Sequence, residues 1–419
     1  MNYSNECAKL DIFRENTKEM FQILNLISNF VPNMAGIYIH IPFCRSRCIY
    51  CGFYSTTALD LSQQYVKAVC RETAMRPFSS EELHTIYLGG GTPSQLTIPQ
   101  LHQIFDAIYK YNKVSADAEV TIEVNPDDVT EAFADGLCWL PVNRISMGAQ
   151  TFDDERLRWL HRRHTSQQVT EAVNYLRDNG IQNISIDLMY GFPGESLDDW
   201  ERDIEAALAL NVEHISAYCL TIEEGTPLWR MLQEGSGEFA IRQQGEANLK
   251  FATQNEETER SMYEVLIDRL EAAGYEHYEI SNFAKPSFRS RHNSSYWNNT
   301  PYIGLGAAAH SYDGHIRSWN IADIRQYIEG MNHGERLFDS EIIEGDTCYN
   351  DRLTVALRTR EGLDLSELSP VHRAYCLKSA SRFLDDNLLR LTPDNHLTLT
   401  RRGLFVSDMI ISDLMLTDF

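Results

Sequence analysis

The 419-residue chain contains no long apolar segment and few basic residues. No run approaches the roughly 20 consecutive apolar residues that a membrane-spanning helix needs, and residues 1–20 carry charges where a secretory signal peptide would be apolar. The 37 Lys and Arg residues stand against 60 Asp and Glu, a formal net charge of -23. Such an acidic chain is a poor general binder of nucleic acid or of anionic membranes. We therefore expect a cytoplasmic protein without a nucleic-acid partner.

The nine cysteines form no disulfide framework. Their number is odd, and most of them follow no regular spacing: Cys7, Cys70, Cys138, Cys219, Cys348 and Cys376. This pattern is typical of reduced thiols in a reducing compartment. Only Cys44, Cys48 and Cys51 lie close together, in the stretch IHIPFCRSRCIYCGF that follows an apolar run. No fourth cysteine completes the group.

Short β-rich segments alternate with helical patterns over the first half of the chain. Strands are predicted at Gly36–Ile41, His84–Gly89, Ala118–Val124, Arg144–Gly148, Asn183–Met189 and His214–Leu220. Helices are predicted between them at Gln63–Met75, Ile98–Tyr111, Ser166–Asn179 and Leu197–Leu210. Repeated βα units imply an α/β fold in which a parallel sheet curls into a full or partial barrel. Chemistry in that architecture lies at the carboxyl ends of the strands.

We expect four segments along the chain. Residues 1–33 form an N-terminal extension, predicted to be helical, and Met34 is an alternative start of translation. Residues 34–256 form the barrel, and residues 257–340 complete it or link it to the last segment. Residues 341–419 are predicted to form a small winged-helix-like domain, because two helical patterns precede two short β runs. This last segment carries 9 basic and 13 acidic residues, net -4 by subtraction, so it lacks the charge of a DNA-binding domain.

Three closely spaced thiolates indicate a site for a soft metal. A structural zinc ion would need a fourth ligand, for which His40 is the nearby candidate. A cubane iron–sulfur cluster with one iron left open fits the three cysteines better, since a catalytic or substrate-binding metal needs an open coordination position.

The CxxxCxxC pattern after a strand resembles the signature of the radical S-adenosylmethionine (SAM) enzymes. The resemblance implies a partial (β/α)6 TIM-like radical SAM barrel, a 4Fe-4S cluster on Cys44, Cys48 and Cys51, SAM bound at the open iron, and an electron donor that reduces the cluster. Carried over from the family's motifs, the SAM-binding residues are Tyr38, Gly90, Gly91, Thr92, Glu123, Gln150, Arg162 and Asp187. Taken singly, each polar residue in this set has an alternative role in pairing with backbone or other charges.

Five motifs narrow the resemblance: YIHIPFC, GGGTP, EVNP, GAQTF and HNSSYW. Together they resemble the oxygen-independent coproporphyrinogen III oxidases and the related heme chaperones. The oxidase motif carries a further cysteine two positions after the third, where this chain has Phe53. This departure favours a chaperone that binds heme and transfers it to apo-hemoproteins, peripheral membrane proteins among them. The alternatives are the oxidase, a radical decarboxylase, and a radical SAM enzyme with another substrate; we assign no catalytic residue.

The HNSSYW motif supplies the candidate heme ligand. His292 offers an imidazole, a common axial ligand of heme iron, beside the aromatic Tyr296 and Trp297. The resemblance also associates this histidine with heme binding. The alternative is a packed histidine with satisfied nitrogens, and His310 is a second candidate that we expect to be structural.

Overall fold

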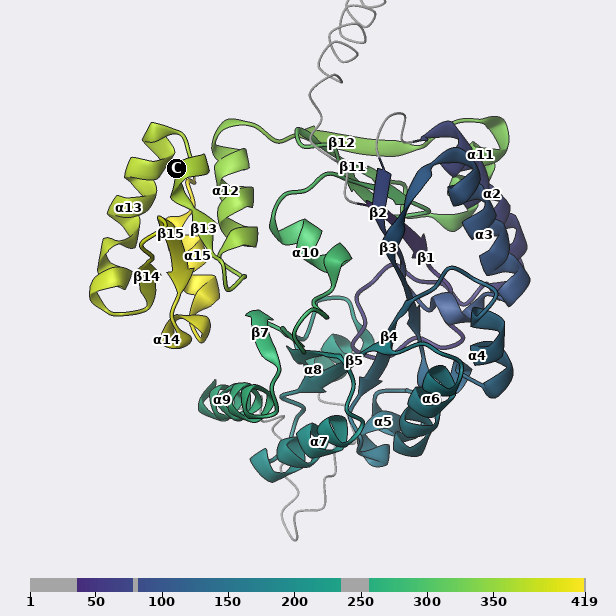
Figure 1. Ribbon diagram of the computed structural model, residues 1–419, viewed down its shortest axis with the longest axis horizontal. Helices are drawn as coiled ribbons and strands as arrows, with labels where there is room; N and C mark the ends of the chain where they lie inside the picture. The colour runs from purple at the N-terminus through teal and green to yellow at the C-terminus, as the bar shows by residue number, and fades with distance from the viewer. Residues whose placement is uncertain (1–35, 78–81, 235–255, 418–419) are drawn as a thin grey trace, which may run out of the picture.

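The computed structural model describes residues 36–77, 82–234 and 256–417. One large sheet carries helices along its outer side, and a small C-terminal module packs beside it (Figure 1). The predicted N-terminal helix and the alternative start at Met34 lie outside the described residues. No helix in the described residues is long and apolar enough to cross a membrane.

Six parallel strands in sequential order form the centre of the sheet: β1 (Gly36–Ile41), β2 (Glu82–Gly90), β3 (Lys113–Val124), β4 (Arg144–Gln150), β5 (Asn183–Tyr190) and β6 (His214–Cys219). Each pairs in parallel with the next, for example Tyr38 opposite Tyr87 and Thr121 opposite Arg144. The predicted α/β class and parallel sheet are therefore confirmed, and the sheet remains open, as a partial barrel does.

Helices follow the strands and cover the outer face of the sheet: α2 (Ser62–Met75), α3 (Ile98–Tyr111), α4 (Glu131–Leu137), α5 (Asp154–Trp159), α6 (Ser166–Asp178) and α7 (Leu197–Ala209). The helix α8 (Pro227–Glu234) lies apart from this layer, and its Leu228 packs with Ile49. Strand residues alternate between the two faces. On β4, Ile145 and Met147 belong to the apolar core shared with the helices, whereas Arg144 and Ser146 lie on the opposite, inner face. Apolar packing on one side thus leaves polar side chains facing the hollow of the open barrel.

Further strands extend both edges of the sheet. After α9 (Glu256–Ala272), the hairpin of β7 (Glu276–Glu279) and β8 (Asn282–Ala284) joins β6 in antiparallel orientation. The short helix α10 (Arg291–Trp297) comes next. The other edge is built by β9 (Tyr302–Leu305), β10 (His310–Tyr312), β11 (Ile316–Asn320) and β12 (Phe338–Ile342), with α11 (Ile324–His333) before the last strand. Figure 1 shows α10 on the inner side of the sheet, opposite the layer of outer helices.

The C-terminal module has its own apolar core, which includes Leu353, Phe383 and Leu397. Its elements are α12 (Gly345–Ala356), β13 (Leu363–Asp364), α13 (Pro370–Asp385), β14 (Leu389–Leu391), β15 (His396–Leu399), α14 (Arg401–Leu404) and α15 (Ser407–Leu414). The expected order of two helices and a hairpin is present, with β13 as an additional strand in a sheet of order β13-β15-β14.

Candidate functional site

The cysteine loop leaves the carboxyl end of β1 and is anchored at both ends by backbone hydrogen bonds. The amide of Cys44 donates to the carbonyl of Thr56 at 2.9 Å, and the amide of Thr56 donates to the carbonyl of Pro42 at 2.7 Å. In the middle of the loop, Ile49 is buried in an apolar cluster with Phe192, and its amide donates to the Leu160 carbonyl at 3.3 Å. The loop therefore has a fixed path, with the thiols on its turns.

All three thiols are free and half-buried. Burial raises the pKa of Cys44 and of Cys51. A guanidinium nitrogen of Arg162 lies 3.7 Å from the Cys48 sulfur, and the Thr92 hydroxyl lies 3.5 Å from the Cys44 sulfur. A cation and a hydroxyl donor so close to buried sulfurs stabilise thiolates, the form that binds metal.

The thiols suit a cluster better than a single ion. Among the described residues, no three His, Cys, Asp or Glu side chains converge closely enough to hold one metal ion. The zinc alternative also loses its fourth ligand, because His40 Nε2 lies 3.0 Å from the Tyr54 carbonyl and its Nδ1 lies 3.1 Å from the Tyr38 hydroxyl. A cubane binds each cysteine through a different iron, so its thiolates need not meet at one point.

The glycines after β2 pack directly against the start of the cysteine loop. Gly90 has φ +110°, and a Cβ there would lie 2.4 Å from the His40 ring. The amide of Gly91 donates to the Ile41 carbonyl at 2.9 Å, and a Cβ on Gly91 would lie 2.8 Å from the Pro42 backbone. Only glycine fits this close approach of two backbones. Thr92, which is buried, comes next and reaches the Cys44 sulfur.

Two carboxyl groups lie on the inner face beside these loops. Glu123 accepts hydrogen bonds from the Gly90 amide at 3.0 Å and from the Tyr87 hydroxyl at 2.8 Å. Burial raises its pKa to about 7. Burial likewise raises the pKa of Asp187 to about 6, although the hydroxyls of Ser216 and Ser146 lower it. Both groups therefore change charge near neutral pH, within reach of the glycine loop.

Arg162 and Gln150 complete the group of predicted SAM residues. Arg162 donates to the Asn125 amide oxygen at 2.9 Å and to the Gly148 carbonyl at 2.5 Å. Gln150 follows an irregularity in β4 and has φ +67°, an uncommon backbone conformation for a residue with a side chain. Tyr38 lies deeper on the inner face, with its ring 6.1 Å from that of Tyr87. The structure thus brings Arg162, Thr92 and Glu123 next to the cysteine and glycine loops, whereas Tyr38 lies farther back along β1.

The sequence analysis did not identify two residues of this region. Asn125 links Arg162 to Thr92, whose hydroxyl accepts from the Asn125 amide at 3.5 Å. Arg144 is only 1% exposed, and two of its guanidinium nitrogens have no hydrogen-bond partner in the described part of the chain. Its charge lowers the pKa of both Glu123 and Asp187. The sequence did contain a signal for Arg144, because it is a single arginine at the start of an apolar strand.

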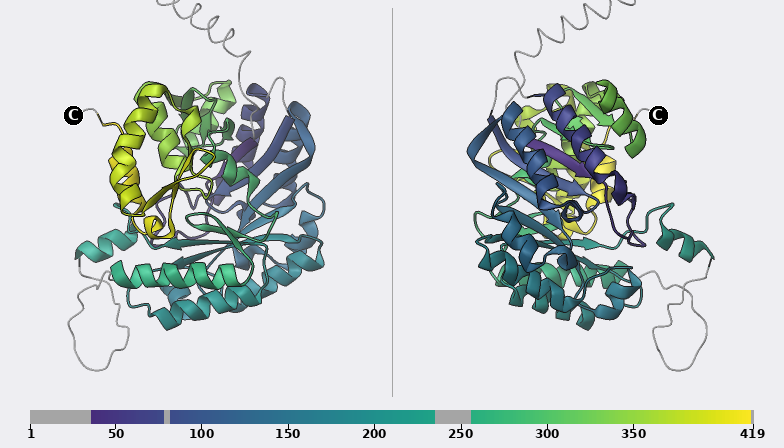
Figure 2. Two further views of the ribbon diagram at one scale, coloured as in Figure 1. Left: turned by 60° about the vertical axis from the view of Figure 1, so that its left-hand side comes forward. Right: turned by 90° about the vertical axis from the view of Figure 1, so that its right-hand side faces the viewer.

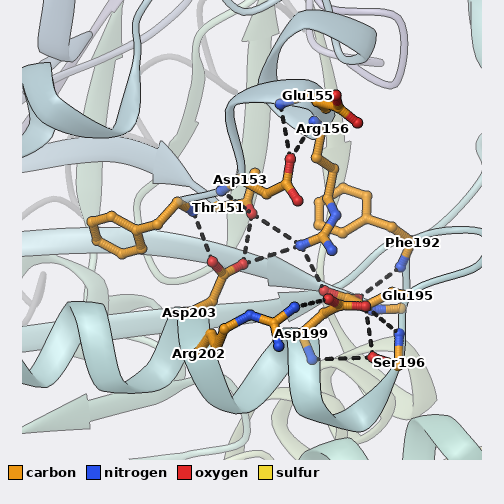
Figure 3. Close-up of polar contacts among 12 residues, drawn as sticks. Thr151, Asp153, Glu155, Arg156, Phe192, Glu195, Ser196, Asp199, Arg202 and Asp203 are labelled. Atoms are coloured by element: carbon orange, nitrogen blue, oxygen red, sulfur yellow. Dashed lines mark hydrogen bonds and ion pairs between the residues drawn. The ribbon is translucent and has the colours of Figure 1, made fainter.

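A buried ionic network joins Arg156 to Glu195 and Asp203 (Figure 3). One guanidinium nitrogen of Arg156 lies 2.9 Å from Glu195 and 3.2 Å from Asp203. Asp203 accepts from the Thr151 hydroxyl at 2.6 Å, and Glu195 accepts from the Phe192 amide at 3.1 Å. Because Phe192 packs in the same cluster as Ile49 of the cysteine loop, this network fixes the surface on which that loop lies. The sequence analysis did not predict it.

His292, the candidate heme ligand, is 1% exposed on α10. Its Nδ1 lies 2.8 Å from the Thr85 hydroxyl and its Nε2 lies 2.9 Å from the Tyr296 hydroxyl. Burial and the charge of Arg144 lower its pKa to about 3. His292 is therefore a neutral, packed side chain with both nitrogens engaged. Phe53, by contrast, is 71% exposed beside the cysteine loop.

Comparison with known proteins identifies relatives over most of the chain. Residues 38–207 match the radical SAM superfamily. The chain is 38% identical over 336 residues to the heme chaperone HemW of Bacillus subtilis, covering 79% of this chain and 85% of that protein. It is 32% identical over 387 residues to HemW of Mycobacterium tuberculosis, covering 91% of this chain and 94% of that protein.

A solved structure agrees with the fold. Coproporphyrinogen III oxidase (HemN) from Escherichia coli, a radical SAM enzyme, superposes with a TM-score of 0.76, covering 92% of this chain and 91% of that chain at 22% identity. At this identity the likeness concerns the fold. Radical SAM proteins carry a 4Fe-4S cluster and use SAM, and the cysteine loop with its neighbouring glycines and carboxylates fits both. The resemblance found in the motifs is thus confirmed, and the chain belongs to the HemW family within the radical SAM superfamily.

Proposed function

We propose that this protein is a heme chaperone, which binds heme and transfers it to apo-hemoproteins. The observation that carries this proposal is the similarity to curated heme chaperones over 79% of this chain and 85% of the Bacillus subtilis protein. Phe53 supports it, because the oxidase motif has a cysteine at that position.

In this proposal each predicted residue has a defined task. Cys44, Cys48 and Cys51 would hold the cluster and leave a coordination position for SAM. SAM would lie against residues of the inner face and of the loops beyond the strands: Tyr38, Gly90, Gly91, Thr92, Glu123, Gln150, Arg162 and Asp187. When bound, the reduced cluster supplies an electron to SAM. The glycines let the amino-acid part of SAM approach the backbone, and Arg162 supplies a cation for its carboxylate.

The two carboxyl groups suit a cationic, hydroxyl-bearing ligand such as SAM. Ionised carboxylates accept hydrogen bonds from ammonium and hydroxyl groups. Glu123 has a pKa of about 7 and Asp187 of about 6, so both ionise more fully as the pH rises from about 6 to about 8. SAM binding is accordingly expected to strengthen over this range.

The heme ligand His292 stays a prediction. Ligation through either nitrogen requires that its hydrogen bond to Thr85 or Tyr296 be broken and that α10 move away from the inner face. The HNSSYW motif otherwise closes the inner side of the barrel.

The recipient proteins, the electron donor and the cellular location belong to the same proposal. A net charge of -23 favours docking onto basic protein surfaces over nucleic acid. We propose a cytoplasmic location, with recipients that include proteins at the membrane periphery. The second candidate function is that of the coproporphyrinogen III oxidase, whose motifs this chain shares except for the cysteine at the position of Phe53.

A paired anaerobic assay on the reconstituted protein separates the two functions. In one sample heme is titrated, the Soret band is followed, and an apo-globin is then added as acceptor. In the other, coproporphyrinogen III is supplied with SAM and a reductant. Stoichiometric heme binding and transfer without decarboxylated product are expected. Formation of protoporphyrinogen without stable heme binding would make the chain an oxidase.

A further inference from the structure

A row of four polar side chains crosses the sheet from its edge to the predicted SAM site. Glu279 on β7 lies opposite Asn282 on β8. Asn282 lies opposite Ser216 on β6, which in turn lies opposite Asp187 on β5. The first three side chains are buried, and the β7 edge faces the C-terminal module (Figures 1 and 2). We name these four residues the polar row. The sequence analysis predicted a role only for Asp187.

The direction of the hydrogen bonds in the polar row is fixed at Glu279. Its Oε1 pairs with Arg358, which follows α12, at 2.9 Å and accepts from the Nε of the same arginine at 3.0 Å. Its Oε2 accepts from the Ser281 amide at 2.9 Å and from the Asn282 side chain at 2.5 Å. Because an ion-paired carboxylate only accepts hydrogen bonds, the group of Asn282 that faces Glu279 is the NH2 group. The amide oxygen of Asn282 therefore faces the other way.

This amide oxygen receives the proton of Ser216. The Ser216 hydroxyl donates to Asn282 Oδ1 at 3.0 Å. On its other side, the same hydroxyl is in hydrogen-bonding contact with the carboxyl group of Asp187, its neighbour across β5 and β6. A hydroxyl carries one proton, so Ser216 serves one of these two acceptors at a time. Asn282 and Asp187 thus compete for a single donor.

We propose that Asn282 is a positioning residue for Asp187, because it takes the Ser216 proton and so keeps the Asp187 carboxylate free to accept hydrogen bonds from its ligand. The inference rests on the proposed function, in which Asp187 contacts SAM. A carboxylate with open acceptor sites gains the full hydrogen bond of a ligand, whereas one already served by Ser216 exchanges one bond for another. SAM carries hydroxyl and ammonium donors that suit such an acceptor.

Other groups around Asp187 act on it without involving Asn282. The charged and titratable ones are Arg144, Arg162, Glu123, Tyr87 and Tyr218. Burial raises the pKa of Asp187 to about 6, and the hydroxyl of Ser216, the two arginines and the hydroxyl of Ser146 lower it. Burial raises the pKa of Glu123 and of both tyrosines, and the charge of Asp187 adds to each rise. Within the described residues, the side chain of Asn282 is hydrogen-bonded only to Glu279 and Ser216. A change at Asn282 therefore reaches Asp187 through Ser216.

Replacing Asn282 by leucine tests this competition. Leucine has the branching of asparagine without its polar atoms, so the Ser216 proton turns to Asp187. A hydrogen bond to the ionised form favours that form, so the pH at which Asp187 ionises should fall by about one unit from about 6. Infrared titration of the protein without SAM measures this pH from the carbonyl band of the protonated acid, which Asp187→Asn identifies by its absence. Calorimetry at about pH 8 should show SAM affinity reduced about fivefold, because Ser216 now fills an acceptor site.

Variants of Ser216 separate the competition from a general loss of structure. In the Ser216→Ala background, Asn282→Leu should leave the ionisation pH of Asp187 unchanged, since the hydroxyl that couples the two residues is gone. Ser216→Ala alone should raise this pH by less than about 0.3 unit, because the proton serves mainly Asn282. The matched control is Asn350→Leu in the C-terminal module. Its side-chain amide bonds to the Leu416 backbone at 2.7 Å and 2.8 Å, so it loses similar hydrogen bonds outside the polar row.

The outcomes separate the role of Asn282 from the proposed function. An unchanged ionisation pH in Asn282→Leu, or the same fall with and without the Ser216 hydroxyl, would overturn the role of Asn282. Should Asn282→Leu fail to fold, Ser216→Ala decides, because a rise of about one unit would show that the hydroxyl serves Asp187 instead. Absence of SAM binding by the wild type would overturn the SAM site, but the infrared result is obtained without SAM and would stand.

Discussion

Replacing Arg156 by methionine tests the ionic network beneath the cysteine loop. The change removes the cation from two buried carboxylates, Glu195 at 2.9 Å and Asp203 at 3.2 Å. Leaving a buried charge without its partner costs about 3–5 kcal/mol. Methionine occupies much of the space of the aliphatic part of the arginine side chain, so lost packing contributes little to the destabilisation. At high pH we therefore expect the free energy of unfolding to fall by about 3–5 kcal/mol. We also expect a lower iron content, because Phe192 and the cysteine loop lose their support.

The loss should depend on pH in a defined direction. Burial raises the pKa of Glu195 to about 7, above its ordinary value of about 4.5. A raised carboxyl pKa means that the folded state holds the proton more tightly, so this contribution is fully present below about pH 4.5 and disappears as the pH rises through about 7. Without Arg156 the pKa rises further. The destabilisation is therefore largest at about pH 8 and falls to about 1 kcal/mol at about pH 5.5, where Glu195 takes up its proton.

Urea denaturation followed by circular dichroism at both pH values measures this difference. Arg202→Met is the matched control, because Arg202 pairs with Asp199 in the same region (Figure 3) but is 68% exposed. Exposed pairs contribute little to stability, so the control should change it by less than about 0.5 kcal/mol. Equal destabilisation by Arg156→Met at both pH values would refute the assignment of the network as a charged one.

Three further predictions concern the loops and the inner face. Cys48→Ser should abolish the iron–sulfur absorption while the circular dichroism stays close to wild type, since serine differs from the half-buried cysteine by a single atom; an unchanged ratio of iron to protein would contradict the ligand assignment. Gly90→Ala should weaken SAM binding at least tenfold in calorimetry, because its Cβ would lie 2.4 Å from the His40 ring at φ +110°; wild-type affinity would refute the tight packing. Arg144→Met removes the charge that lowers the pKa of Glu123, so the pH at which SAM affinity is half-maximal should move above about 7; an unshifted profile would show that Arg144 does not control this carboxyl.

Local sequence signals predicted the central elements well. β1 and α3 have the predicted ends, and the other five parallel strands lie within a few residues of the predicted ones. These elements are long or strongly periodic, so short-range preferences determine them. The strands β9 to β12 were not predicted. These strands are short and carry little periodic signal of their own. They become recognisable as strands only when the folded chain pairs them at the edge of the sheet.

Some residues of the candidate site could likewise be predicted from the sequence and others could not. The three cysteines could be singled out because their spacing within one short motif is itself the signal, whereas the glycine and carboxylate positions came from the family resemblance. Arg156, Glu195 and Asp203 carry no such signal, since they come from three different segments and acquire their roles only through burial against one another. Arg144 is similar, because its effect on Glu123 and Asp187 depends on register across neighbouring strands.

His292 shows how one motif can support two interpretations. The spacing that puts an imidazole beside Tyr296 suits a heme ligand, but on α10 it also places the two side chains one turn apart, where they bond to each other. The His292 ring stacks on Tyr87 at 5.1 Å, and the Tyr87 hydroxyl donates to Glu123. Moving His292 onto heme iron would therefore disturb a predicted SAM residue.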